Sequence, residues 1–186
     1  MIRIDRVITR GGDGGQTSLG DGARLSKDAA RIEAIGAIDE TNAAIGFLRA
    51  ACPEAGEARA MLARIQNDLF DVGADLAVPG TAGDRLRLTD APCLRLEQEV
   101  AAMNEAIPPL TSFILPGGTE AAARAHLART TARRAERALV RLMGEETLNP
   151  ALLRFLNRLS DHLFVLARAL NDNGARDIPW QPGAGR

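Results

Sequence analysis

The chain is poor in aromatic residues, has no tyrosine and has almost no lysine. Phe, Trp and Tyr together make up 3% of the 186 residues, so the stacking platforms that hold single-stranded nucleic acid have almost nothing to be built from. Lys27 is the only lysine among 23 basic residues. Arginine holds phosphate and carboxylate with a planar fork. An arginine bias can also come from genome composition, so the bias alone decides nothing about function.

Long apolar runs, a net charge and cysteine motifs are also missing. No run of about 18 apolar residues is present, and Met1–Asp5 lacks the apolar stretch of a signal peptide. We therefore expect no membrane span, no export and a cytoplasmic location. The net charge of -1 gives no bulk attraction for nucleic acid or anionic lipid. Cys52 and Cys93 match no metal or redox spacing and are expected in the core.

What is present fits one globular domain. Hydrophobic residues make up 46% and charged residues 25% of the chain. Residues 9–22 are dense in glycine, and we expect no regular element there. Ser26–Asp28 is a candidate cap for the first helix. Five helical segments are predicted after the loop, at residues 28–51, 54–77, 90–107, 118–146 and 150–173. Residues 183–186 are expected to fray.

Apolar residues recur on one face of the predicted helices in alternating steps of three and four, the pattern of an amphipathic helix. In residues 118–146 this stripe is mostly alanine, which allows neighbouring helices to pack closely. Pro108–Pro109 and Asn149–Pro150 mark helix boundaries, and Gly174 stands where a C-terminal cap belongs. No linker is long enough to divide domains. The pattern predicts an all-α bundle with short connections.

A row of arginines is the strongest chemical signal in the residues themselves. Arg129, Arg133, Arg137 and Arg141 are spaced by four and therefore share one helix face. Stacked cations repel by about a few tenths of a kcal/mol per pair, so the row needs acids or an anionic ligand. Because a helical row drifts by about 20° in seven residues, Arg129 and Arg133 can face one site while Arg141 points elsewhere. Two interpretations stay open: a solvated face paired with acids, and a polyphosphate clamp.

The glycine-dense loop favours the clamp, because exposed backbone N–H groups are the other usual half of a phosphate site. It is not a Walker loop, since Lys27 follows Ser26 and precedes Asp28. No strand precedes it in a βαβ unit, as a dinucleotide fingerprint requires. A plain surface turn remains the alternative.

Other polar residues carry weaker signals. Asp39 stands mid-helix among Ile, Ala and Gly, which predicts a partner, either an interface pair or an orienter of a catalytic group. Asn157 and Asp161 lie four apart and are expected on ordinary helix surface. His126 and His162 lack the glutamate three residues earlier that di-iron bundles use. No Ser/His/Asp or Cys/His arrangement favours nucleophilic catalysis.

Five motifs occur in order over nearly the whole chain. They are residues 9–19, 31–40, 113–118, 128–137 and 156–161. Together they resemble the propanediol-utilisation type of ATP:cob(I)alamin adenosyltransferase, and their combination is far more specific than any one of them. The chain departs from the family's common pattern at Ile8, Gly11 and Gly14.

The resemblance implies an all-α, five-helix bundle of ferritin-like up-down arrangement with a Gly-rich N-terminal loop. It implies one domain, with an ATP-binding loop at 1–27, a bundle at 28–174 and a tail at 175–186. It also implies a homotrimer that binds ATP and the corrinoid between adjacent subunits. Co(I) would attack the 5′ carbon of ATP, giving adenosylcobalamin and triphosphate. The ATP would carry Mg²⁺ mainly on its phosphates, with no protein metal ligand. A flavin-dependent reductase and a cobalamin-dependent acceptor enzyme are possible partners.

The same resemblance implies roles for individual residues. Asp39 would pair with Arg129 across the subunit boundary, and both would act with Arg133 and Phe113 as the catalytic set. Phe113 would lie against the corrinoid and displace its lower axial ligand, although an aromatic in this setting is as often a core anchor. The residues implied to bind ATP are Thr9, Arg10, Gly11, Gly12, Thr17, Ser18, Lys27, Arg133, Arg134, Glu136, Arg137 and Asn157.

Two other classes of function stay open on the sequence. A non-catalytic carrier or sensor would bind ATP or cobalamin with the same clamp and would not turn over excess ATP. A purely structural helical oligomer would leave the arginine row solvated, and ATP would then not change its melting temperature.

Overall fold

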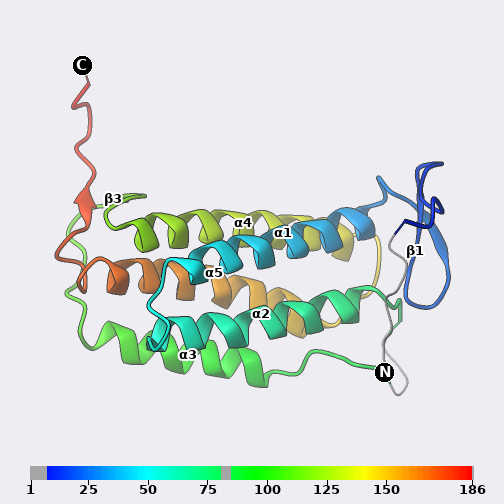
Figure 1. Cartoon of the computed structure of the whole chain (residues 1–186), viewed down its shortest axis with the longest axis horizontal. Coiled ribbons are helices and arrows are strands. Elements are labelled where there is room, and N and C mark those ends of the chain that lie inside the picture. The colour runs from blue at the N-terminus through cyan, green and yellow to red at the C-terminus, as the bar shows by residue number, and fades with distance from the viewer. Residues whose placement is uncertain (1–7, 81–84, 186) are drawn as a thin grey trace.

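The computed structural model describes residues 8–80 and 85–185. The first seven residues of the predicted ATP loop and Arg186 of the predicted tail lie outside the described residues. Within the described part the chain forms five helices in an elongated bundle, which confirms the predicted fold (Figure 1). The helices are α1 (Ala30–Ala50), α2 (Glu57–Leu76), α3 (Ala91–Asn104), α4 (Glu120–Met143) and α5 (Pro150–Leu170). None of these helices combines the length and apolarity that a membrane crossing needs.

The centre of the bundle is α4, which packs against both α1 and α5. Helix α2 packs on α1, and α3 packs on α5. The predicted alanine stripe explains the close approach around α4, because Ala125, Ala128 and Ala132 are completely buried. Cys52 and Cys93 are buried free thiols, as predicted.

Two short antiparallel sheets lie at opposite ends of the bundle (Figure 1). Strand β1 (Gln16–Ser18) pairs with β2 (Arg24–Ser26) at one end, and β3 (Ile114–Leu115) pairs with β4 (Ile178–Pro179) at the other. The expectation of no regular element in residues 9–22 is wrong, because β1 lies inside that stretch. The purely helical interpretation of the rest is wrong at β3 and β4. These strands are too short to produce an alternating pattern in the sequence.

Two helix ends differ from the predicted caps. Helix α1 begins after Ala29, which provides no side-chain cap, whereas Ser26 belongs to β2. Helix α5 ends at Leu170 with Asn171 as its C-cap. Gly174, at φ 90°, still closes this end, since its N–H donates to the Arg168 carbonyl at 2.9 Å.

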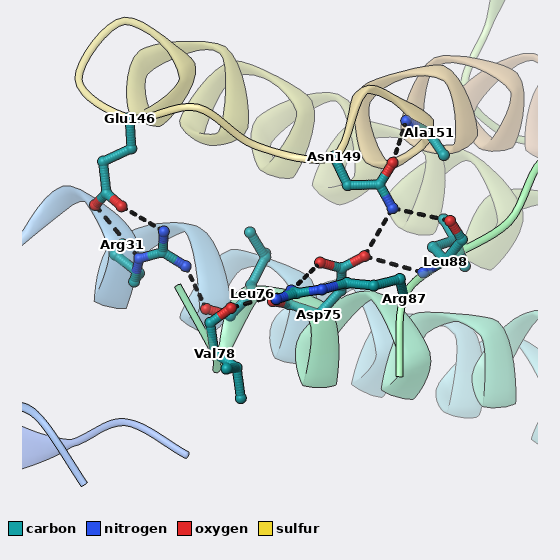
Figure 2. A network of polar contacts seen from close by, with 9 residues as sticks. All are labelled: Arg31, Asp75, Leu76, Val78, Arg87, Leu88, Glu146, Asn149 and Ala151. Atoms are coloured by element: carbon teal, nitrogen blue, oxygen red, sulfur yellow. Dashed lines mark hydrogen bonds and ion pairs between the residues drawn. The ribbon is translucent and has the colours of Figure 1, made fainter. Parts of the chain in front are cut away.

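A buried carboxylate joins three segments at the end of the bundle that carries β1 and β2 (Figure 2). Asp75 is only 3% exposed. Its carboxylate accepts hydrogen bonds from Arg87 Nη1 at 2.6 Å, from the Leu88 N–H at 2.9 Å and from Asn149 Nδ2 at 2.8 Å. These contacts fix the C-terminal turn of α2, the segment before α3 and the start of α5 relative to one another.

Arg31 fixes the start of α1 to the same region (Figure 2). Its guanidinium is buried, donates from Nη1 to the Leu76 carbonyl at 2.5 Å and pairs with Glu146 beyond the end of α4. The end of the bundle to which the β1–β2 hairpin attaches is therefore a rigid platform.

Candidate functional site

The predicted ATP loop forms a hairpin that docks on the end of α2. The Gly20 N–H donates to the Ala77 carbonyl at 2.8 Å, and Leu19 is buried. Thr17 and Ser18 lie in β1, and Arg24 of β2 donates to the Gly11 carbonyl at 2.8 Å. The hairpin is therefore held both at its turn and at the glycine-rich segment before β1, residues 9–15, which we call the glycine-rich arm.

The glycine-rich arm packs against the only lysine. A Cβ built at Gly12 would lie 3.0 Å from Nζ of Lys27. Thr9, Arg10 and Gly11 precede this contact and are exposed. The N–H groups of Gly11 and Gly12 donate to none of the described residues, so they remain available to an anion.

The arginine row divides as its helical drift predicts. Arg129 and Arg133 line one cavity of about 200 Å³ between α4 and α5, together with Ser160, Asp161 and Phe164. Arg141 points elsewhere. Its side chain is 74% exposed and lies 3.9 Å from the Glu145 carboxylate.

The arginines of α4 also differ in whether they form an ion pair with an acid. Burial and, second, the neighbouring Arg133 charge lower the pKa of Arg129. The buried Nε of Arg129 donates to no described group, and neither Arg129 nor Arg133 forms an ion pair within the described part of the chain. Arg134 and Arg124 instead pair with acids, Glu40 and Glu120. Within the row, the solvated-face interpretation suits Arg141, which pairs with Glu145. Arg129 and Arg133 instead share a cavity with Asp161 and form no ion pair among the described residues.

Helices α4 and α5 bring two further predicted nucleotide residues together. Asn157 Nδ2 donates to the Glu136 carboxylate at 3.0 Å. Arg137 turns back along α4, where its Nη1 donates to the Arg133 carbonyl at 3.1 Å.

Asp161 is a site residue that the sequence interpretation missed. It was expected on ordinary helix surface, but it lines the cavity of Arg129 and Arg133. Its position four residues after Asn157 was the available signal, because that spacing places both on one face of α5.

The two halves of the predicted nucleotide site share no polar contact in the part of the chain that the structure describes. Among the described residues, no hydrogen bond or ion pair links the hairpin to α4. The predicted pair of Asp39 and Arg129 is also separated. Asp39 lines a groove of about 480 Å³ between α1 and α2 with Ile35 and Phe70, whereas Arg129 faces the cavity between α4 and α5. Asp39 and Arg129 thus form no ion pair among the described residues, and their pairing across a subunit boundary stays a prediction.

Phe113 lies at the opposite end of the bundle from the hairpin. Its side chain is 78% exposed, so the core-anchor interpretation is wrong. The physical reason is its place just before β3, an edge strand that pairs only with β4 at the end of the bundle. Phe113 and Trp180 line a hollow of about 430 Å³.

The two histidines are buried inside the bundle. His162 Nε2 lies 2.8 Å from the Glu99 carboxylate, and the His126 ring packs edge-to-face on Phe164 at 6.1 Å. No three His, Cys, Asp or Glu side chains gather into a metal site anywhere in residues 8–80 and 85–185. That Mg²⁺ is held by ATP rather than by protein ligands stays a prediction.

Proteins similar to this chain are adenosyltransferases. The family model described as cobalamin adenosyltransferase matches residues 7–170. A cobalamin adenosyltransferase from Cupriavidus metallidurans is 49% identical over 181 residues, with 96% of each chain covered. A corrinoid adenosyltransferase from Mycobacterium bovis is 41% identical over 190 residues, covering 100% of this chain and 97% of that one. The structure of a variant PduO-type ATP:corrinoid adenosyltransferase from Lactobacillus reuteri, complexed with cobalamin and ATP, superposes with a TM-score of 0.88. It shares 36% identity and covers 95% of this chain and 99% of that chain.

Proposed function

Because this chain belongs to the cobalamin adenosyltransferase family, we propose that it transfers the 5′-deoxyadenosyl group of ATP to cob(I)alamin. The electron pair of Co(I) forms the new bond to the 5′ carbon, and the C5′–O bond breaks with its electrons passing to the triphosphate. The products are adenosylcobalamin, formally Co(III), and inorganic triphosphate. The names of the relatives favour this transferase over a non-catalytic carrier or sensor.

The observation that carries the proposal is the cavity shared by Arg129 and Arg133. Arg129 and Arg133 form no ion pair among the described residues, and Asp161 is the one acid among the residues that line their cavity, so a net positive charge remains there. The departing triphosphate gathers negative charge in the transition state. Preorganised cations that face developing charge are a major source of rate acceleration. The triphosphate brings its own Mg²⁺ in this proposal.

The nucleotide site is completed by a neighbouring subunit. The hairpin residues Thr9 to Ser18 and Lys27 would hold the triphosphate, while Arg133, Arg134, Glu136, Arg137 and Asn157 would contact the same nucleotide from the next subunit. The lack of a hydrogen bond or ion pair between the hairpin and α4 among the described residues supports this division. The separate grooves of Asp39 and Arg129 support it independently, since a second copy brings an anion to Arg129. We propose the homotrimer on this basis.

Phe113 would bind the corrinoid and displace its lower axial ligand. Loss of that ligand makes Co(II) easier to reduce, and one electron from a reduced flavin would then give Co(I). A flavin-dependent reductase, a cobalamin-dependent acceptor enzyme, a cytoplasmic location and a single adenosyltransferase domain over residues 1–186 remain parts of the proposal.

Incubation of the protein with excess ATP, Mg²⁺ and chemically reduced cobalamin tests the proposal. We expect the corrinoid absorption spectrum to change to that of adenosylcobalamin, with one triphosphate released per corrinoid over many turnovers. A spectral change limited to one equivalent per subunit would indicate a carrier or sensor instead. No change at all would overturn the proposed transfer.

A further inference from the structure

The C-terminal segment forms a strap over the loop that carries Phe113. We call residues 177–182 the strap. Strand β4 in the strap pairs with β3, with Ile178 opposite Leu115 and Pro179 opposite Ile114. The Trp180 N–H then donates to the Phe113 carbonyl at 2.8 Å, and the Ser112 hydroxyl donates to the Trp180 carbonyl at 3.3 Å. The backbone of Phe113 is therefore held by the backbone of Trp180.

The two side chains are also in contact. The rings of Phe113 and Trp180 meet edge-to-face, with centroids 6.2 Å apart and an interplanar angle of 62°. Edge-to-face geometry is a favoured arrangement of aromatic pairs. Because Phe113 is 78% exposed, core packing does not fix its ring. Among the described aromatic rings, that of Trp180 packs against it.

A buried polar cluster fixes the start of the strap. Arg168, Asn171 and Asp177 form this cluster at the end of α5. Arg168 Nε donates to the Asp177 carboxylate at 2.8 Å, and Asn171 Nδ2 donates to the same carboxylate at 3.1 Å. The Asp177 side chain is 6% exposed. A buried ion pair is costly to form and requires accurate geometry, so it holds its segments in one place.

The same cluster holds both ends of the loop that carries Phe113. Arg168 Nη2 donates to the Pro108 carbonyl at 2.8 Å, and Asn171 Nδ2 donates to the Gly117 carbonyl at 3.1 Å. Asn171 also packs so closely on Gly118, at φ 99°, that a Cβ there would lie 2.2 Å from its Oδ1. The loop and the strap are thus tied to one point, and the contact with the Trp180 ring is left to hold the exposed ring of Phe113.

We infer that Trp180 is a positioning residue for Phe113: its ring sets where the Phe113 ring stands against the lower face of the corrinoid. This inference rests on the proposed function. A ring that must displace an axial ligand needs a fixed distance from the corrinoid. A shift of about 1 Å in the position of a group at a reacting centre can lower the rate by about 10²-fold. The strap supplies that support without reaching the arginine cavity of α4 and α5.

The test separates the reduction of Co(II) from the transfer to Co(I). In Trp180→Ala we expect turnover driven by a reduced flavin to fall by about tenfold or more. Turnover with chemically supplied Co(I) should stay within about threefold of the wild type, because the strap does not reach the arginine cavity. A threefold change corresponds to a change of about one RT in the activation barrier. The electron paramagnetic resonance spectrum of bound Co(II) should regain the nitrogen splitting of its lower ligand. Trp180→Phe should restore most of the flavin-driven rate, because it keeps an aromatic ring beside Phe113.

The neighbouring variant Gln181→Ala is the matched control, since it shortens an exposed side chain of the same strap. It should behave as the wild type in both assays. Equal losses of Trp180→Ala in the two assays, or no loss in either with an unchanged Co(II) spectrum, would overturn the positioning role. A wild-type protein that is inactive with chemically supplied Co(I) would overturn the proposed function instead, so the two failures are distinguishable.

Discussion

Lys27 occupies the space that a side chain at position 12 would need. A Cβ at Gly12 would lie 3.0 Å from Nζ and 3.3 Å from Cε of Lys27. The backbone of Lys27 is held as well, because its N–H donates to the Gly15 carbonyl at 2.9 Å. The ammonium assigned to the triphosphate therefore lies against the glycine-rich arm, although Lys27 as a whole is exposed.

Gly12→Ala should lower kcat/KM for ATP by about tenfold, because the Lys27 ammonium must move by a few tenths of an ångström. The melting temperature should stay unchanged, since the atom that moves is the end of a flexible side chain. Gly14→Ala is the control, because a Cβ there meets nothing within 4 Å. Steady-state kinetics of the two variants checks the expectation, and equal losses in both would contradict it.

Arg133→Ala and Lys27→Ala should each lower turnover by about 10²–10³-fold, as the removal of one charge donor to a transition state often does. Lys27→Arg should rescue only in part, because a compact ammonium and a planar fork are not interchangeable. Arg141→Ala removes an arginine from the same row of α4, where it pairs with Glu145, and should change little. The assignment fails if both alanine variants at Arg133 and Lys27 remain within about threefold of the wild type, a difference of only about 0.65 kcal/mol in the barrier.

The helices and the division of the arginine row could be predicted because both follow from the repeat of about 3.6 residues per turn of an α-helix. Leu69 and Val72 are buried where the stripe of α2 places them, and Arg129 and Arg141 separate as the helical drift requires. The hairpin could not be predicted in the same way. Its strands have three residues each, and the density of glycine around them hides the buried Leu19.

The remaining differences involve contacts between segments far apart in the chain. The sequence around Phe113 suits the core and a corrinoid contact equally, because nothing local shows that β3 lies at an edge. The pairing of β3 with β4 joins residues more than 60 positions apart. Asp161 was assigned to plain surface because its neighbours Arg129 and Arg133 come from another helix. The predicted contact of Asp39 with Arg129 would join two copies of the chain, so the structure of one chain shows only the separate groove or cavity of each partner.

Asp39→Ala and Arg129→Ala should each dissociate the proposed trimer. If the pair is desolvated between subunits, removal of one partner should cost about 3–5 kcal/mol, because the other charge is left buried. A solvated pair would cost at most about 1 kcal/mol. Sedimentation of each variant, with turnover measured alongside, distinguishes the two.

Glu33→Ala, which removes an exposed carboxylate from the same helix, should leave the trimer intact. The double variant Asp39→Arg with Arg129→Asp should recover part of the assembly, because the pair is restored with reversed charges. A fully active monomer in any of these samples would refute the shared site.

Glu99 should make stability depend on pH. Burial alone would raise the pKa of Glu99, but the hydrogen bonds and charges of His162 and Arg64 outweigh it and hold the pKa below its ordinary 4.5. A lowered pKa in the folded state stabilises the protein above the unfolded value, and this stabilisation is lost as pH falls through the folded value. Glu99→Gln should therefore lower the free energy of unfolding by about 1–3 kcal/mol at pH 7. The difference from the wild type should shrink once the pH falls below about 4.5.

Urea unfolding of both proteins at neutral and acidic pH measures this difference. Glu97→Gln on the same helix is the comparison, because Glu97 pairs with Arg158 at 2.6 Å but is 48% exposed. An exposed pair contributes at most about 1 kcal/mol. A loss in Glu99→Gln that is the same at both pH values would contradict the role given to its carboxylate.

Phe113→Ala separates electron transfer from alkyl transfer. Because the ring is 78% exposed, its removal should change the free energy of unfolding by no more than about 0.5 kcal/mol beyond the lost contact with Trp180, itself about 0.5–1.5 kcal/mol. A buried phenylalanine would instead cost about 3–5 kcal/mol. Turnover should fail when a reduced flavin must first produce Co(I). It should largely persist when Co(I) is supplied chemically, because the arginine cavity proposed to receive the triphosphate is intact. Parallel assays with the two reductants, together with a melting curve, decide the matter: equal losses in both would remove Phe113 from the reduction step.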